Sequence, residues 1–342
     1  MQTFIASIVI FGLLILVHEL GHYFVARLTG IRVLELAIGF GPKLVGWTKN
    51  GIDYSLRIVP LGGFCRMLGE SPEEADEPDS FPRQSIAKRA ATLFAGSAMN
   101  LVLALVLFFT IFFFIVGVPD TETSTIGYIV DDSPAEEAGI EAGDIITTID
   151  GNAISTWEEV LTTISAKPEQ EINLTIERDG SLTEYAVTTE LAPLPDGGDR
   201  GVIGIGPKID MYSFFPALAV SFERFGDILT ALYQVVAGEA PLDVAGPVGI
   251  VHTIGEVAQT GFVNLLVLTA LISINLGIIN LLPIPALDGG RLLFLLIEAV
   301  RGRPIEPEKE GLIHFIGFAL LITLILLVTY QDVLRFIIAP NN

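Results

Sequence analysis

The run His18-Glu19-Leu20-Gly21-His22 holds residue types that can hydrolyse a peptide bond with the help of a metal ion. Residues i and i+4 share one face of a helix, so both imidazoles can reach a single cation. Glu19 lies beside them and can serve as general base for a water molecule on that cation. The run therefore predicts a catalytic metal site with His18 and His22 as ligands and Glu19 as the base.

The residues around this motif, 4–26, are otherwise almost all apolar. Ionisable groups inside a membrane are costly and rare, and they are usually functional. Asn100 is a second polar side chain within an apolar stretch. A buried polar cluster that only packs helices against each other is the alternative interpretation.

Two histidines leave a zinc ion short of ligands, so a third ligand is required. We expect Asp288, which follows Pro283 and Pro285 at the end of an apolar stretch. Proline cannot continue a helix, and non-helical backbone at membrane depth is tolerated only where it is buried in protein or lines a wet cavity. His18, His22 and Asp288 would then hold Zn²⁺ and leave a fourth position for water.

Asp288 also has a structural interpretation, as the N-cap of a helix over residues 289–301. The metal role therefore does not follow from Asp288 alone. The remaining histidines, His252 and His314, have no motif around them and are expected to be packing or interfacial residues.

The composition of the 342-residue chain indicates a membrane protein, because 51% of the residues are hydrophobic and only 17% are charged. The net charge of −21 argues against nucleic acid as a partner. A single cysteine, Cys65, excludes an internal disulfide framework. Four stretches are long enough to span a bilayer: residues 4–26, 90–118, 263–282 and 312–330. Residues 214–236 predict an amphipathic helix on the membrane surface.

The distribution of charge predicts the orientation of these spans. The loops after the first and third spans are rich in Lys and Arg, whereas residues 119–262 carry five basic and 25 acidic residues. Basic loops stay in the cytoplasm. We therefore expect a protein of the cell (inner) membrane, with the acidic stretch extracytoplasmic and the active site toward the cytoplasmic side.

Residues 123–192 have the pattern of a small water-exposed domain. The run SPAEEAGIEAGDIITTIDG predicts a short helix, a turn and a strand, and an amphipathic helix and two further strands follow. This order resembles a PDZ domain, a module that binds extended peptides by strand addition. We expect a PDZ domain at 119–195 that meets a peptide or the ectodomain of a substrate. Steric exclusion of large ectodomains is the favoured role, and capture of a C-terminus is the alternative.

The motif HELGH in a first span, the PDZ pattern, GPVGI at 246–250 and NLLPIPALDGG at 280–290 together resemble the site-2 protease family of intramembrane zinc metalloproteases. More narrowly, the chain resembles the bacterial members that cleave anti-sigma factors. The resemblance implies that His18, His22 and Asp288 bind zinc and that Glu19 is the base. It also implies that Asn280 contacts the substrate or the oxyanion.

The resemblance further implies a membrane-reentrant β-hairpin at 32–68, in which a strand at 52–61 holds the substrate in extended form. Tyr54, Leu56 and Ile58 alternate there with more polar positions, as in a half-buried strand. The acidic segment 70–85 is expected to be a cytoplasmic linker.

The expected fold is a polytopic α-helical membrane protein with four transmembrane helices, a membrane-associated β-hairpin and an inserted extracytoplasmic α+β PDZ domain. Segments 1–118 and 263–342 form the protease core, and 196–262 is a linker with the surface helix. The expected function is an intramembrane zinc endopeptidase that cleaves single-pass membrane proteins, such as pre-trimmed anti-sigma factors or signal-peptide remnants, in or near the bilayer. Two alternative functions were considered. A catalytically silent PDZ adaptor would lack part of the metal-binding set, which is complete here, and an ion transporter would show internal repeats, which the sequence does not.

Overall fold

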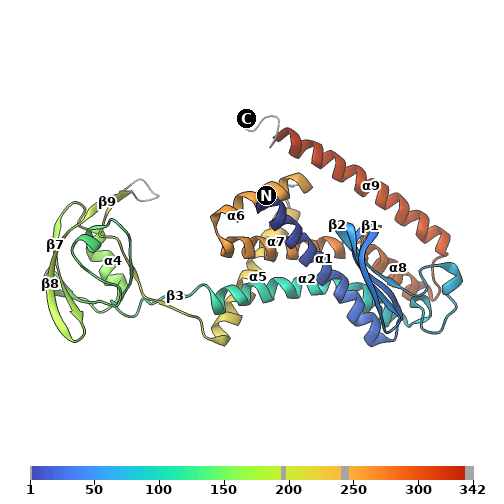
Figure 1. The fold of residues 1–342 in the computed structure, drawn as a ribbon, viewed down its shortest axis with the longest axis horizontal. Coiled ribbons are helices and arrows are strands. Elements are labelled where there is room, and N and C mark those ends of the chain that lie inside the picture. Colours follow the sequence, from blue (N-terminus) through green and yellow to red (C-terminus); the bar gives the residue numbers. More distant parts are fainter. Residues whose placement is uncertain (1, 194–197, 240–245, 336–342) are drawn as a thin grey trace. The chain divides into compact units, whose positions relative to one another are not determined.

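The computed structural model describes residues 2–193, 198–239 and 246–335 (Figure 1). The chain divides into two compact units. Unit 1 consists of Met1–Ile111 with Leu218–Asn342, and unit 2 consists of Phe112–Ala217. Residues 336–342, the end of the predicted segment 263–342, lie outside the described part.

Four helices of the described chain are long and apolar enough to cross a membrane. They are α1 (Gln2–Thr29), α2 (Ile86–Phe114), α7 (Phe262–Leu281) and α9 (Pro307–Val333). The four predicted spans are confirmed, with ends that differ by a few residues. The chain is therefore a multi-pass membrane protein.

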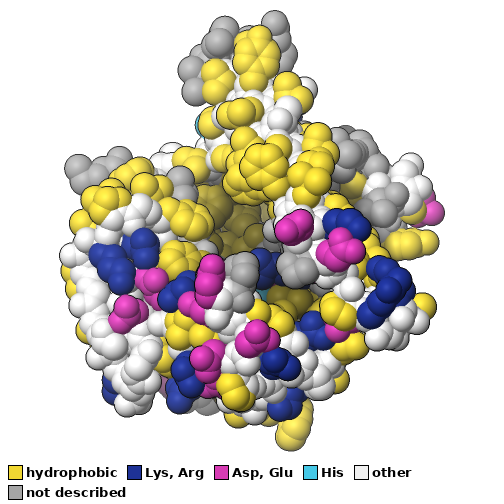
Figure 2. Space-filling view, turned by 90° about the vertical axis from the view of Figure 1, so that its right-hand side faces the viewer, with side chains coloured by type: hydrophobic (Ala, Val, Ile, Leu, Met, Phe, Trp, Pro, Cys, Tyr) yellow, Lys and Arg dark blue, Asp and Glu magenta, His cyan; other side chains and the backbone are white. Residues whose placement is uncertain are grey.

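Part of the surface of unit 1 is apolar enough to face lipid. On α9, Phe315 and Leu320 are 68% and 66% exposed. Figure 2 shows hydrophobic side chains over the projecting part of this face and in the hollow beside it, whereas charged side chains gather on its lower half. Large contiguous apolar surfaces mark membrane or partner contacts, so this distribution separates a lipid-facing part from a water-facing part.

Three further helices complete unit 1: α5 (Phe214–Val236), which begins in unit 2, α6 (Pro247–Thr260) and α8 (Asp288–Arg301). The GPVGI segment begins α6, and Asp332 near the end of α9 accepts hydrogen bonds from the N–H groups of Gly246 (3.2 Å) and Gly249 (2.7 Å). This buried carboxylate satisfies two N–H groups that the first turn of a helix leaves free. The end of α9 is thereby fixed to the start of α6.

A buried ion pair connects α2 with α8. Two guanidinium nitrogens of Arg89 donate to the two carboxylate oxygens of Glu298, over 3.0 and 2.5 Å. Both side chains are nearly buried. Removal of one partner from such a pair costs roughly 3–5 kcal/mol, because the other charge is left buried alone. The pair therefore holds α8, which begins with Asp288, against α2.

The predicted hairpin consists of two long strands, β1 (Val33–Lys49) and β2 (Ile52–Met67), which fold back on each other. Residues 53–56 of β2 pair with 35–38 of β1 on one side and with 45–48 of β1 on the other. Residues 33–38 of β1 also pair with 63–67 of β2. The result is a small bent sheet rather than a two-stranded hairpin, with outer segments 43–49 and 63–67.

The predicted substrate strand at 52–61 needs correction in its central part. Residues 53–56 have a strand partner on each side, so their backbone groups are already used. Among the described residues of the sheet, segments 43–49 and 63–67 have only one strand partner. A substrate strand can be added at these two outer edges. Arg57 and Val59 also have a partner on one side only, Lys43 and Phe40, so this part of the predicted strand is not excluded.

The expected burial of alternate residues in β2 is also reversed. Ser55 is buried, whereas Leu56 and Ile58 are 44% and 53% exposed. Ser55 donates to Glu35 over 3.0 Å, and Arg57 donates to the same carboxylate oxygen over 2.7 Å. Polar groups turn inward and apolar groups outward because lipid, unlike water, cannot satisfy polar groups.

Segment 70–85 packs against the base of this sheet through two short 3₁₀ helices, η1 (Pro72–Glu74) and η2 (Phe81–Arg83). Asp79 accepts from Arg32 over 2.6 Å, and the N–H of Phe81 donates to Leu68. The predicted linker is therefore a folded part of unit 1.

Unit 2 contains the PDZ domain. Its central sheet has the order β6-β5-β7-β8, and helix α4 covers a core that includes Trp157, Ile146 and Leu174. The elements are β3 (Val118–Pro119), β4 (Ile126–Ile129), α3 (Pro134–Glu137), β5 (Ile145–Ile149), β6 (Asn152–Ala153), α4 (Trp157–Ser165), β7 (Glu171–Arg178) and β8 (Ser181–Thr188). Thr156 and Glu159 form a capping box that begins α4.

Unit 2 extends past the predicted end at residue 195. The added strands are β9 (Glu190–Pro193), β10 (Asp199–Val202), β11 (Ile205–Pro207) and β12 (Ile209–Asp210). β11 pairs with β4 and β12 pairs with β3. Ile203, between β10 and β11, is 1% exposed in the core. The glycine-rich sequence suggests a linker, but its alternating Val and Ile residues complete the domain.

Asp144 is a buried carboxylate whose negative charge stabilises the PDZ domain. Arg178 donates to both its oxygens, over 2.6 and 2.7 Å, and the N–H of Glu141 donates over 2.9 Å. Burial alone would raise the pKa of Asp144, but these hydrogen bonds outweigh it and lower the pKa below its ordinary value.

Because the folded-state pKa is lowered, this carboxylate stabilises the domain above its ordinary pKa, and the contribution is lost as pH falls through the folded value. We expect the urea midpoint of the Trp157 fluorescence transition, in a Trp47→Phe background, to fall between about pH 5 and pH 3. The urea midpoint of Asp144→Asn should be lower at neutral pH and should change less with pH. Asp179→Asn, at an exposed turn, should have the same midpoint as the parent protein at each pH. Equal pH dependence in Asp144→Asn and the parent would contradict this assignment.

Candidate active site

The three residues expected to bind a metal ion lie in contact in unit 1. The distance between His18 Nε2 and Asp288 Oδ2 is 3.2 Å, and that between His22 Nε2 and the same oxygen is 3.3 Å. The two Nε2 atoms are 3.2 Å apart. Among the described residues, this is the group of His, Cys, Asp and Glu side chains that could hold a metal ion.

The turn between α7 and α8 places Asp288 beside the two histidines. Leu287 is the N-cap of α8, and Asp288 is the first residue of the helix, so its side chain is not the helix cap. Gly289 and Gly290 follow, and a Cβ on either would overlap backbone carbonyls of residues 281–284. The two glycines therefore let α8 fold back closely against the end of α7.

Helices α1 and α2 approach closely at glycines beside the histidines. A Cβ at Gly21 would lie 2.7 Å from the carbonyl carbon of Ala95. A Cβ at Gly96 would overlap His22 Nε2 and lie 2.9 Å from His18 Cε1. Gly21 thus permits the crossing of the helices, and Gly96 leaves the volume that the two imidazoles occupy.

The backbone of α2 fixes the tautomer of His22. The Nδ1–H of His22 donates to the carbonyl oxygen of Thr92 over 2.8 Å, and Thr92 is fully buried. The lone pair of Nε2 then faces Asp288 and His18. A second hydrogen bond of this kind is typical of histidines that bind metals.

Asn100 stands in the corresponding place beside His18. Its amide nitrogen is 3.4 Å from His18 Nδ1, and its buried Oδ1 has no hydrogen-bond partner in the described part of the chain. A half-turn of this amide brings Oδ1 to His18, where it accepts the Nδ1–H and leaves Nε2 free for a metal. Ser273 on α7 donates to the Asn100 carbonyl over 2.7 Å, which anchors this part of α2.

The cluster has the properties of a cation site. Asp288 Oδ2 is buried and has no hydrogen-bond partner among the described residues, yet it faces the two Nε2 atoms. Three electron-rich atoms so close together repel one another unless a cation lies between them. Four ligands about 2.0–2.1 Å from a tetrahedral zinc ion stand about 3.3 Å apart. The donor set and its spacing therefore fit zinc with one open position.

Glu19 lies on the same turn of α1, against the outer segment of β2. Its carboxylate faces the backbone of Cys65. A Cβ at Gly63 would lie 3.3 Å from Glu19 Cγ and 2.9 Å from the carbonyl oxygen of Ala37. Gly63 therefore allows the sheet to approach Glu19 closely, and the edge 63–67 runs beside the candidate base.

The remaining candidate residues are Asn280, His252 and His314. Asn280 is half-buried in the last turn of α7, and within the described part of the chain its amide makes no hydrogen bond. His252 faces Glu256 on α6 (3.5 Å), and His314 accepts from the backbone of the turn before Asp288, so neither joins the cluster.

Sequence reasoning gave Thr92 and Gly96 no role at the site, although both touch the cluster. Thr92 acts through its carbonyl oxygen, which every residue has. Gly96 lies in the run 95–100, which resembles a motif in the second span of the site-2 proteases, but the motif did not indicate contact with the histidines.

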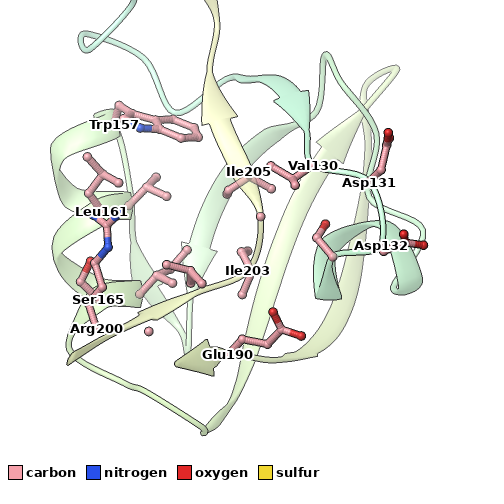
Figure 3. Close-up of a pocket in the computed structure, with 16 residues that line it drawn as sticks. Val130, Asp131, Asp132, Trp157, Leu161, Ser165, Glu190, Arg200, Ile203 and Ile205 are labelled. Carbon is pink, nitrogen blue, oxygen red and sulfur yellow. The ribbon is translucent and has the colours of Figure 1, made fainter. Parts of the chain in front are cut away.

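Unit 2 carries a groove of about 440 Å³ between α4 and the strands β10 and β11 (Figure 3). Leu161 on α4 and Ile203 and Ile205 on the opposite side give it an apolar lining, and Arg200 lies near one end. Within the described residues, the N–H groups of Ile203 and Gly204 have no backbone acceptor. The groove thus combines an apolar wall with donors that can bind a carboxylate.

Comparison with known proteins gives a consistent picture. The chain matches Peptidase family M50 over residues 6–324. It is 37% identical to the zinc metalloprotease RasP of Oceanobacillus iheyensis, over 98% of this chain and 99% of the relative. It is 34% identical to the regulator of sigma-W protease RasP of Bacillus subtilis, over 98% and 99%.

Among solved structures, the PDZ domain of the SdrC-like protein from Listeria monocytogenes is 26% identical, with a TM-score of 0.22, over 25% of this chain and 85% of that one. The match over residues 6–324 confirms the resemblance to the site-2 proteases that HELGH and NLLPIPALDGG indicated. The chain belongs to Peptidase family M50.

Proposed function

We propose that this chain is an intramembrane zinc endopeptidase that uses His18, His22 and Asp288 as zinc ligands and Glu19 as general base. The observation that carries the proposal is the unpartnered Asp288 oxygen 3.2–3.3 Å from two imidazole nitrogens, among membrane-spanning helices. A silent PDZ adaptor would need no such cluster. The names of the relatives, zinc metalloprotease and sigma-W regulator protease, support the same function.

Zinc held by these three residues supplies Lewis-acid chemistry for peptide hydrolysis. The Glu19 carboxylate takes a proton from the attacking water and then gives it to the nitrogen of the leaving amine. Asn280, whose amide makes no hydrogen bond among the described residues, donates to the carbonyl oxygen of the scissile bond as charge develops there.

The substrate is bound as an added strand at edge 63–67 of β2. Of the two free edges of the sheet, this is the one beside Glu19, because Gly63 and Cys65 touch that residue. Extension exposes the scissile carbonyl, which in a helix is hydrogen-bonded and crowded. Edge 43–49 is the opposite edge of the same sheet, so it serves as a matched control.

The substrates are single-pass membrane proteins, such as anti-sigma factors already trimmed on the outer side. The basic loops flanking the spans support a position in the cell membrane with the PDZ domain extracytoplasmic and the active site toward the cytoplasm. The groove between α4 and β11 supports capture of a trimmed C-terminus by the PDZ domain. Steric exclusion of large ectodomains is the competing role.

His18→Ala, His22→Ala and Asp288→Ala should each lose bound zinc and activity, because each removes a ligand. Glu19→Gln should keep zinc and lose activity, because it removes only the base. Elemental analysis of the purified proteins, with His252→Ala as control, makes the comparison. Full zinc occupancy in Asp288→Ala would mean that another group is the third ligand.

Oxidative cross-linking tests the substrate edge. Cys65 is the chain's single cysteine and is buried, so the thiol is moved to the neighbouring, partly exposed position in a Cys65→Ser, Arg66→Cys protein. In a Glu19→Gln background, single cysteines moved along the substrate should react with the cysteine at position 66 at alternate positions, since side chains of a strand alternate between faces. A Cys65→Ser, Val45→Cys protein, which carries the thiol at the other edge, should react weakly. Cross-links that repeat every three to four residues, or stronger reaction at Val45→Cys, would contradict strand addition at 63–67.

Leu161→Asp places a charge in the apolar groove of the PDZ domain and should raise KM for a trimmed substrate about 10-fold with kcat unchanged. Leu182→Asp, at an exposed position of β8 outside the groove lining, is the control. Steady-state cleavage in detergent measures both. Wild-type kinetics in Leu161→Asp, together with cleavage of untrimmed substrate after deletion of the domain, would favour steric exclusion and refute capture.

A further inference from the structure

The turn that delivers Asp288 depends on a hydrogen-bond acceptor from another helix. Between α7 and α8, Pro283 and Pro285 have no N–H. The N–H groups of residues 282, 284 and 287 donate to carbonyls of residues 279, 282 and 284, within the turn or the end of α7. The N–H of Ala286 instead donates to Nδ1 of His314 on α9, over 2.9 Å.

Ala286 also has an unfavourable backbone conformation. Its φ is +81°, in a region that residues with a Cβ seldom adopt. Such a conformation persists only where the surroundings hold it. Ala286 lies two residues before Asp288, so a change at Ala286 moves the carboxylate relative to the two histidines.

A second contact, one turn further along α9, acts on the same turn. Gly317 lies against Pro285, and a Cβ there would overlap Pro285 Cβ and lie 2.7 Å from the Pro285 carbonyl oxygen. His314 and Gly317 are three residues apart and share one face of α9. This face of the fourth span is therefore shaped to receive the turn 284–287.

The surroundings of His314 keep its ring in place. The ring packs edge-on against Phe294 of α8, with centroids 5.2 Å apart. Since Nδ1 accepts from Ala286, the ring proton is on Nε2, which faces Glu310 at 3.8 Å. We propose that His314 is a positioning residue for the zinc site, which fixes Asp288 through the backbone of Ala286 and thereby couples the fourth span to the metal.

The test measures metal geometry rather than cleavage. Purified full-length protein is loaded with Co²⁺, and its visible absorption spectrum and the zinc concentration that displaces Co²⁺ are recorded. His314→Leu should change the spectrum and weaken zinc binding by about 10-fold. His314→Asn should restore both, because Asn Oδ1 takes the place of Nδ1 as acceptor. His252→Leu should match wild type.

A second pair of variants leaves His314 intact. Gly317→Ala pushes against Pro285 and should change the Co²⁺ spectrum in the same way, whereas Gly311→Ala, with no atom within 4 Å of the added Cβ, should not. The proposal is overturned if Gly317→Ala and His314→Leu both keep the wild-type spectrum, or if His314→Asn is as impaired as His314→Leu. The inference rests on Asp288 as a zinc ligand. If Asp288→Ala keeps the wild-type Co²⁺ spectrum, Asp288 is not a metal ligand, and this result is distinct from a failure of the His314 proposal.

Discussion

The structure of unit 1 depends on the close approach of one carboxylate oxygen to two imidazole nitrogens, 3.2–3.3 Å away. These groups repel one another without a cation, because each presents a lone pair or a negative charge to the others. The surrounding helices hold them together through the carbonyl of Thr92, the amide of Asn100 and the ion pair of Arg89 with Glu298. The packing of three helices, α1, α2 and α8, thus keeps the three candidate ligands around one site.

The lipid environment explains the inverted pattern of the sheet. Ser55, Glu35 and Arg57 satisfy one another on its inner side, whereas Leu56 and Ile58 face outward. The sheet places edge 63–67, which has a strand partner on one side, beside Glu19. In the proposed mechanism a substrate helix unwinds onto this edge before it is cleaved.

Local sequence predicted which side chains lie together. HELGH on an apolar helix predicted two metal ligands and a base, and the resemblance to the site-2 proteases implied Asp288 as the third ligand; the structure brings His18, His22 and Asp288 into one group. Their roles in metal binding stay predictions. The folding of β1 and β2 into a bent sheet was not predictable from the sequence. A simple two-stranded hairpin and this sheet would show the same alternation of residue types along each strand. The end of the PDZ domain was placed too early, since β11 and β12 pair with β4 and β3, some 80 to 90 residues away in sequence. His314 had no motif because its role is to accept a single backbone N–H.

X-ray absorption at the zinc edge of the purified, full-length protein tests the central claim most directly. The account predicts one zinc per chain with two imidazole nitrogens and oxygen ligands at about 2.0–2.2 Å, and no sulfur. A sulfur neighbour at about 2.3 Å, or a single imidazole, would contradict a site made by His18, His22 and Asp288.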